Sequence, residues 1–270
     1  QHTLGAPIII ADGEKGYDGK AFPLPKKLPG FSLDEVEVAS TLLEADVMMV
    51  VSHGKGHRLT GFGGALKNLA MGCTTKRTKA AQHAGHGLRF DASKCVGCME
   101  CIEACPYGAL EKGENGLPRH LPEKCTYCLT CMFTCPQEAY GLEANAKERF
   151  QEAVAQAAYG VVEALKGGCR IGYITFLQDI TLYCDCVPAG TPIVGNIGLL
   201  ASLDPVAIDK AALDLIDRSK PLVEVEPPDI LGKLNKTDSF NHVRLAASLG
   251  LGSVEYELVE VQVEERILED

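Results

Sequence analysis

Eight of the twelve cysteines in this 270-residue chain fall within one stretch, from Cys95 to Cys135. They form two runs with the same spacing, C-x2-C-x2-C-x3-C, and a proline follows each run, Pro106 or Pro136. Such a run suits a cubane [4Fe–4S] cluster, in which each of the four irons takes one cysteine thiolate. The stretch therefore predicts two clusters. The need to bring eight cysteines into two ligand sets constrains the fold more than any other feature of the sequence.

The spacing also predicts which cysteines share a cluster, because the fourth cysteine of such a run binds the cluster of the other run. The predicted ligands are Cys95, Cys98, Cys101 and Cys135 for cluster 1, and Cys125, Cys128, Cys131 and Cys105 for cluster 2. Gly97 is expected to supply a backbone turn beside the sulfides. Residues 91–141 resemble, position by position, a bacterial ferredoxin module with two [4Fe–4S] clusters.

Other uses of clustered cysteines fit this spacing less well. A disulfide framework is typical of small secreted domains rather than of a 270-residue α/β chain. Zinc ribbons use paired C-x2-C knuckles instead of two four-cysteine runs, each followed by proline. A single cluster, or a [3Fe–4S] form, is the remaining iron–sulfur alternative.

Composition narrows the choice of partners and surroundings. The net charge of −10 disfavours nucleic acid and anionic membrane as partners. No apolar run approaches the ~18 residues that a membrane span needs. Thiolate clusters are sensitive to oxygen, so we expect a reducing, cytoplasmic setting, as in an anaerobe, and a redox protein as partner.

Residues 47–90 contain no Asp or Glu, although an even spread of the 36 acids over 270 positions would place about six there. The segment carries seven basic side chains and four histidines. Its glycine-rich loop, Gly61–Gly64, lies between a predicted strand and a predicted helix, where α/β proteins bind ligands and where backbone N–H groups suit anions. We expect Lys55 and Lys67 to face an anionic ligand or partner. The alternative is a packing turn before an amphipathic helix, since no Walker motif is present.

The remaining pattern predicts an α/β fold with a mainly parallel sheet and flanking helices. Strands are expected at residues 5–11, 46–51, 170–176 and 192–200, with a closing edge strand at 254–263. Helices are expected from Ser32 to about residue 43, at 145–166, after the cap Asp204, and at 239–249. The core is then discontinuous, formed by residues 1–90 and 142–270, and a small ferredoxin-like α+β cluster domain at 91–141 interrupts it.

The four other cysteines allow a further site. Cys184 and Cys186 flank Asp185 in a C-x-C turn after a predicted strand, and Cys73 ends the glycine-rich segment. We consider a third metal or cluster at Cys73, Cys184 and Cys186, with His53, His57 or His83 as nitrogen ligands. A redox dithiol is another possibility. The alternative is that these cysteines are inert buried hydrophobes, which is the interpretation for Cys169.

Several motifs outside the cysteine runs resemble one known family. They are Ser52-His-Gly-Lys-Gly-His57, Gly61-Phe-Gly-Gly-Ala-Leu-Lys-Asn-Leu-Ala-Met-Gly-Cys73, His83, Cys184-Asp-Cys186, and Ser202-Leu-Asp-Pro-Val-Ala-Ile-Asp209. Together they are similar to the DUF362 domain, and the similarity extends over nearly the whole chain. The resemblance implies an α/β core with an inserted ferredoxin module, and it specifies no reaction.

The sequence therefore favours one-electron transfer through two [4Fe–4S] clusters, toward a site in the α/β core or toward a partner. The first alternative is a reductase, an oxidoreductase with its own catalytic or metal site in that core. The second is a cluster scaffold or maturation subunit of a larger redox complex. Cluster potentials range from roughly −700 to +450 mV, so the spacing does not set the direction of electron flow.

Overall fold

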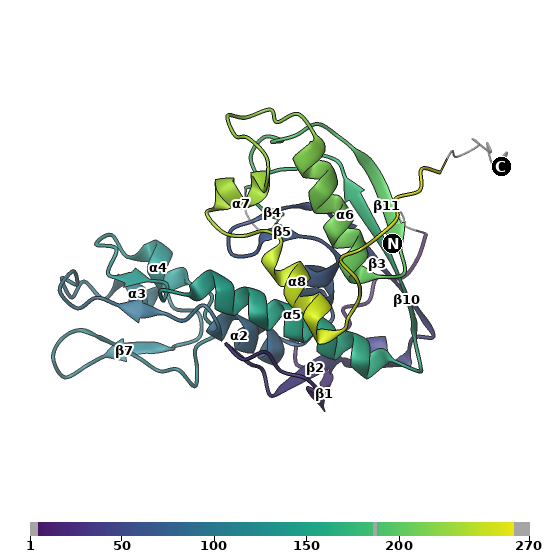
Figure 1. Cartoon of the computed structure of the whole chain (residues 1–270). Coiled ribbons are helices and arrows are strands. Elements are labelled where there is room, and N and C mark those ends of the chain that lie inside the picture. The colour runs from purple at the N-terminus through teal and green to yellow at the C-terminus, as the bar shows by residue number, and fades with distance from the viewer. Residues whose placement is uncertain (1–4, 186–187, 262–270) are drawn as a thin grey trace.

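A computed structural model describes residues 5–185 and 188–261 (Figure 1). The strands are β1 (Gly19–Pro23), β2 (Glu35–Ala39), β3 (Val47–His53), β4 (Lys55–His57), β5 (Gly61–Gly63), β6 (Arg89–Phe90), β7 (Leu110–Lys112), β8 (Pro118–His120), β9 (Tyr140–Gly141), β10 (Arg170–Leu177) and β11 (Gly198–Ser202). The helices are the 3₁₀ helix η1 (Ser40–Glu44), α1 (Ala65–Lys67), the π-helical turn η2 (Asn68–Gly72), α2 (Lys76–Ala84), α3 (Glu100–Glu103), α4 (Thr130–Thr134), α5 (Ala146–Leu165), α6 (Pro205–Arg218), α7 (Ile230–Asn235) and α8 (Asn241–Leu249).

The chain folds into a mixed α/β structure, as expected, but its sheets are mostly antiparallel. The main sheet has the order β11-β10-β3, in which β3 runs parallel to β10 and β11 runs antiparallel to it. The other described strand pairs, β1–β2, β4–β5, β6–β9 and β7–β8, are all antiparallel. The prediction of a mainly parallel sheet is thus wrong for the described residues. Short connections such as the one between β4 and β5 allow only antiparallel pairing.

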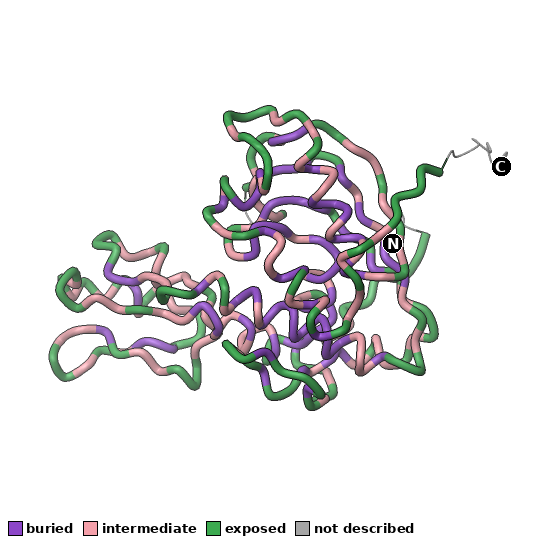
Figure 2. The backbone as a smooth tube through the Cα atoms, in the orientation of Figure 1, coloured by how far each residue is buried: buried purple, intermediate pink, exposed green. Residues whose placement is uncertain are grey.

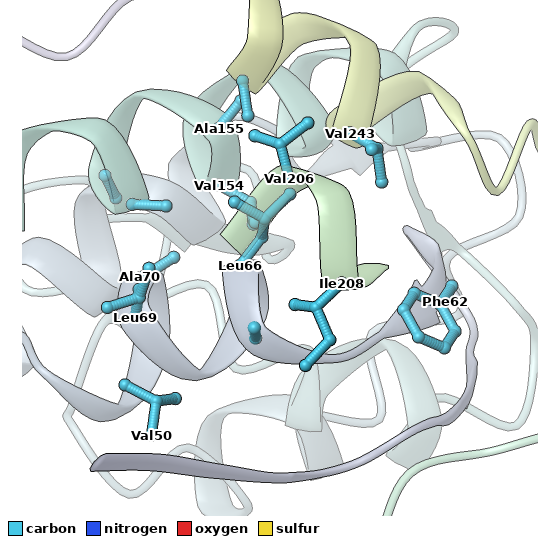
Figure 3. Close-up of a cluster of buried hydrophobic side chains, with 14 of the residues drawn as sticks. Val50, Phe62, Leu66, Leu69, Ala70, Val154, Ala155, Val206, Ile208 and Val243 are labelled. Atoms are coloured by element: carbon cyan, nitrogen blue, oxygen red, sulfur yellow. The ribbon is translucent and has the colours of Figure 1, made fainter. Parts of the chain in front are cut away.

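Helix α5 is the centre of the core. Its apolar residues at helical spacing, Phe150, Val154, Ala157, Val161 and Leu165, are buried along the whole helix. Figure 3 shows side chains of α5 meeting those of the segment after β5, α6 and α8, including Leu66, Val206 and Val243. Burying each large apolar side chain stabilises the fold by roughly 1.5–3 kcal/mol, so this face is a major source of stability.

One glycine of α5 permits a close approach to β2. A Cβ atom at Gly160 would stand 2.7 Å from Leu24 Cδ2 and 2.8 Å from Val36 Cγ2. Glycine is therefore retained in the middle of this helix, although it costs helix stability, because a larger residue would push β2 away from α5.

Four segments differ from the sequence-based expectation. Of the strand expected at 192–200, only the part from Gly198 onward is strand, as β11, and Pro192 and Val194 form isolated bridges. Residues 5–11 form no strand, and Ile8, Ile9 and Ile10 are each about two-thirds exposed, because no neighbouring strand pairs with them. The helix expected from Ser32 is instead β2 followed by η1, since Val36 and Val38 alternate with glutamates and both are buried. The described part of 254–263, up to Val261, contains no strand. The expected strands at 46–51 and 170–176 and the helix at 145–166 are confirmed as β3, β10 and α5.

The cluster stretch projects from the core. Figure 1 shows α3, α4 and β7 extending to one side, joined to the rest through the N-terminal end of α5. In Figure 2 buried backbone concentrates in the main body, whereas the projecting part is mostly half-buried or exposed. None of the helices in the described residues has the length and apolar character required to cross a membrane.

A buried carboxylate ties α6 to the glycine-rich loop. Asp209 of α6 is fully buried and accepts hydrogen bonds from the backbone N–H groups of Ala65 (2.7 Å) and Leu66 (2.9 Å), which begin α1. Burial raises the pKa of Asp209 to about 7, opposed by these two hydrogen bonds. A Cβ at Gly64 would lie 2.3 Å from Asp209 Oδ1, so glycine is required where the loop meets the carboxylate.

Replacing Asp209 with alanine should destabilise the protein strongly. The Ala65 and Leu66 N–H groups would be buried without an acceptor, at a cost of roughly 1–3 kcal/mol each. We expect a lower urea midpoint of unfolding for Asp209→Ala than for the unsubstituted protein. Asp34→Ala is the matched control, because Asp34 is exposed and its carboxylate pairs with Lys27 at the surface, so its midpoint should not move measurably. An unchanged midpoint for Asp209→Ala would contradict this role.

Candidate functional site

The cysteine stretch is built as two copies of one motif, thirty residues apart. A left-handed residue, Met99 or Leu129, precedes the short helix α3 or α4 in each copy. Each copy also ends with the same contact, in which a backbone N–H donates to the fourth cysteine: Ala109 to Cys105 Sγ (3.3 Å) and Ala139 to Cys135 Sγ (3.4 Å). Hydrogen bonds of this kind help to set the potential of an iron–sulfur cluster.

Each copy contributes its fourth cysteine to a cavity formed mainly by the other copy. One cavity is lined by Cys95, Cys98, Cys101 and Cys135. The other is lined by Cys125, Cys128, Cys131 and Cys105. These are the two ligand sets that the spacing predicts, so the donor set and its arrangement fit two cubane clusters.

The thiols of these cavities need a positive partner to ionise. Burial, followed by the neighbouring Cys125 and Cys128 thiols, raises the pKa of Cys131 to about 12. Burial also raises the pKa of Cys101 and of Cys125. Iron ions would supply the positive charge that makes thiolates favourable in such a setting, and their binding would displace the thiol protons.

The cysteines are not arranged for a single ion. Within residues 5–185 and 188–261, no three His, Cys, Asp or Glu side chains have the geometry to hold one metal ion. Sulfurs that share one zinc stand ~3.8 Å apart, given Zn–S bonds of about 2.3 Å in a tetrahedron. Cubane thiolates are spaced more widely, because each binds a different iron.

The residues considered for a third metal site lie in separate places. His53 and Lys55 meet Asp185, with Lys55 Nζ 2.6 Å from Asp185 Oδ1 and His53 Nδ1 3.4 Å from Asp185 Oδ2. Cys184 adjoins this group, and Cys186 lies outside the described residues. Cys73 instead packs in the core beside β2, where its carbonyl accepts from Ala39 N–H (3.0 Å), and burial raises its pKa to about 11. The described residues therefore do not bring Cys73 together with the Asp185 group.

His57 and His83 belong to a different cluster, which surrounds Phe150 at the start of α5. The ring centroids of His57, His83 and His86 lie 6.0, 5.1 and 6.0 Å from that of Phe150. His242 of α8 is fully buried nearby and stacks on Phe62 (6.5 Å). We call His57, His83, His86 and His242 the histidine cluster.

The histidine cluster is held in the neutral form. Burial lowers the pKa of His83 and of His242 to about 4 and that of His57 well below its usual value. The charge of the Lys67 ammonium lowers the pKa of all three further. Burial also lowers the pKa of His86.

Tyr127 connects the cluster stretch to the histidine cluster. It lines the Cys125 cavity, and its ring centroid is 6.2 Å from that of His86. Tyr127 has φ +54°, at the position where the first copy has Gly97 with φ +70°. A bulky residue rarely adopts this left-handed conformation, so the tyrosine side chain is retained there against backbone strain.

Sequence reasoning missed Tyr127, Phe150 and His242 as parts of this region. The sequence does contain a signal for Tyr127, because the second cysteine run has tyrosine at the position where the first run has Gly97. His242 lies more than 150 residues beyond the acid-free segment, so no local pattern links it to His83.

Comparison with known proteins identifies the family. The model of the domain of unknown function DUF362 matches residues 3–214. No curated protein and no solved structure matches the chain. The chain belongs to the DUF362 family.

Proposed function

We propose that this protein transfers electrons one at a time through two [4Fe–4S] clusters held by residues 91–141. The observation that carries the proposal is the pair of cavities, each lined by three cysteines of one copy and the fourth cysteine of the other. When bound, each cluster would accept and release a single electron. The cysteines would hold the two clusters side by side, because Cys105 and Cys135 each line the cavity formed mainly by the other copy.

The two cavities differ in their relation to the α/β core. The Cys95 cavity is lined by residues of the cluster stretch alone, from Cys95 to Tyr140. The Cys125 cavity is also lined by Leu88 and by Tyr127, whose ring approaches His86. His86 in turn lies beside Phe150 of α5. Cluster 2 would thus be the one that exchanges electrons with the core, and cluster 1 the one that exchanges them with a partner.

A reductase that carries out its reaction in the α/β core is the second candidate. The histidine cluster favours it, because His57, His83 and His86 gather around Phe150 beside Tyr127 of the Cys125 cavity, and neutral imidazole nitrogens can bind a substrate. The proposed route from the Cys125 cavity ends at this cluster. Turnover of a substrate with a low-potential electron donor would distinguish a reductase from a simple carrier.

Protein purified without exposure to air should contain about eight iron and eight sulfide per chain. Cys101→Ala should lower the iron content to about half, because it removes one ligand of cluster 1 and none of cluster 2. Cys169→Ala is the matched control and should leave the iron content unchanged, since Cys169 lies outside both cavities. The measurement is iron and sulfide analysis with the visible absorption spectrum. Zinc as the main metal would contradict the proposal.

The crossed pairing of cysteines makes a second prediction, about double variants. Cys105→Ala and Cys131→Ala should damage the same cluster, so combining them should lose no more iron than either alone. Cys131→Ala combined with Cys135→Ala should lose both clusters. If Cys105→Ala combined with Cys131→Ala instead removes nearly all of the iron, each copy binds its own cluster and the crossed assignment is wrong.

A further inference from the structure

We propose that the two clusters have unequal reduction potentials, and that cluster 2, the one nearer the core, has the higher potential. The difference comes from residues at equivalent positions of the two cysteine runs, chiefly Thr130 in the second run and Glu100 in the first. One electron would leave cluster 1 and enter cluster 2, while no bond forms or breaks and no proton moves. This inference rests on the proposed function and adds to it where the electron rests.

The contacts of the cysteine sulfurs decide which cluster is easier to reduce. Reduction adds negative charge to a cluster and its thiolates, so a hydrogen bond donated to a sulfur stabilises the reduced state more than the oxidised state. A negative charge nearby has the opposite effect. The cluster with more donors and fewer carboxylates should therefore have the higher potential.

The hydroxyl of Thr130 contacts a ligand of cluster 2. Thr130 Oγ1 lies 3.2 Å from Cys128 Sγ. An iron-bound thiolate carries no hydrogen, so the hydroxyl is the donor once the site is loaded. Thr130 is half-buried at the start of α4, where water screens the bond only in part. Glu100 has the equivalent place in the first run, and an ionised carboxylate has no hydrogen to donate.

The backbone adds a second difference in the same direction. The N–H group of Tyr127 donates to Cys125 Sγ at 3.3 Å. At the equivalent position, no hydrogen bond from the Gly97 N–H group to a cysteine is found among the described residues. The backbone donors to the two fourth cysteines occur in both cavities, at 3.3 and 3.4 Å, and so do not distinguish the clusters.

One contact favours cluster 1 instead. Tyr140 Oη donates to Cys101 Sγ at 3.6 Å, and the equivalent residue in the other cavity is Leu110, which has no donor. This bond is longer than the Thr130 contact and therefore weaker. Helix α3 also carries two acidic residues in its first turn, whereas α4 carries none. The remaining differences thus outweigh Tyr140 and raise the potential of cluster 2 above that of cluster 1.

The test is a redox titration of protein purified without air, followed by electron paramagnetic resonance. Cys101→Ala removes a ligand of cluster 1, and Cys131→Ala removes the equivalent ligand of cluster 2, so each variant reports the potential of the other cluster alone. Because each variant lacks one neighbouring cluster, the comparison is balanced. We expect a higher potential in Cys101→Ala than in Cys131→Ala.

A second substitution tests the hydroxyl of Thr130. In the Cys101→Ala background, Thr130→Val should make reduction of the remaining cluster at least about threefold less favourable, equivalent to ~28 mV for one electron. Thr130→Ser keeps the hydroxyl and should leave the potential unchanged. A role in packing alone would give the reverse pattern, because valine keeps the size of threonine and serine does not. Thr134→Val, on the same helix, is the matched control and should have no effect, since no described hydrogen bond joins Thr134 to a cysteine.

Iron and sulfide analysis of the same samples separates this inference from the proposed function. A chain without iron–sulfur clusters would contradict both. Two clusters of equal potential, or a higher potential at cluster 1, would overturn this inference alone, and so would an unchanged potential in Thr130→Val. Should Thr130→Val lose iron, Thr130→Ala takes its place with the same expected shift.

Discussion

The burial of α5 is the interaction on which the rest of the structure depends. Its apolar face carries the core that joins η2, α2 and α8, and its first turns stand where the cysteine stretch returns to the core. Phe150 therefore has two roles. It is fully buried in the core, and its ring is the surface against which His57, His83 and His86 pack. A single helix thus fixes the histidine cluster relative to the cysteine cavity that contains Tyr127.

The basic residues of the acid-free segment differ in whether a carboxylate balances their charge. His53 ends β3 and Lys55 begins β4, and both side chains pair with the carboxylate of Asp185. The negative charge of Asp185 balances the positive charge of Lys55. Lys67, by contrast, has no ion-pair partner among the described residues, whereas Lys55 is paired.

The sequence predicted the features that local spacing encodes. The α5 helix follows from apolar residues at helical spacing, and the two cysteine sets follow from repeated short loops. The helix predicted from Ser32 was wrong, because Val36, Ala39, Leu42 and Leu43 have helical spacing while Val36 and Val38 also alternate as in a strand. In the fold this part of the chain pairs with β1 as β2, and Val36 lies against Gly160 of α5.

The remaining features depend on contacts between distant parts of the chain, which no local pattern encodes. The run Ile8–Ile10 has the composition of a buried strand but no partner in the described structure. His57 and His83 come from β4 and α2, and they are brought together only because both rings pack against Phe150 of α5. The expected meeting of Cys73 with His53 failed for the same kind of reason, since Cys73 packs beside β2.

Electron paramagnetic resonance of the reduced protein, purified without air, tests the central claim most directly. Two adjacent [4Fe–4S] clusters predict about two unpaired electrons per chain after full reduction, with a spectrum broadened by magnetic interaction between neighbouring centres. The crossing of Cys105 and Cys135 between the two cavities requires that interaction. A fully reduced sample with no signal, or with a single unbroadened signal of about one electron per chain, would contradict the account.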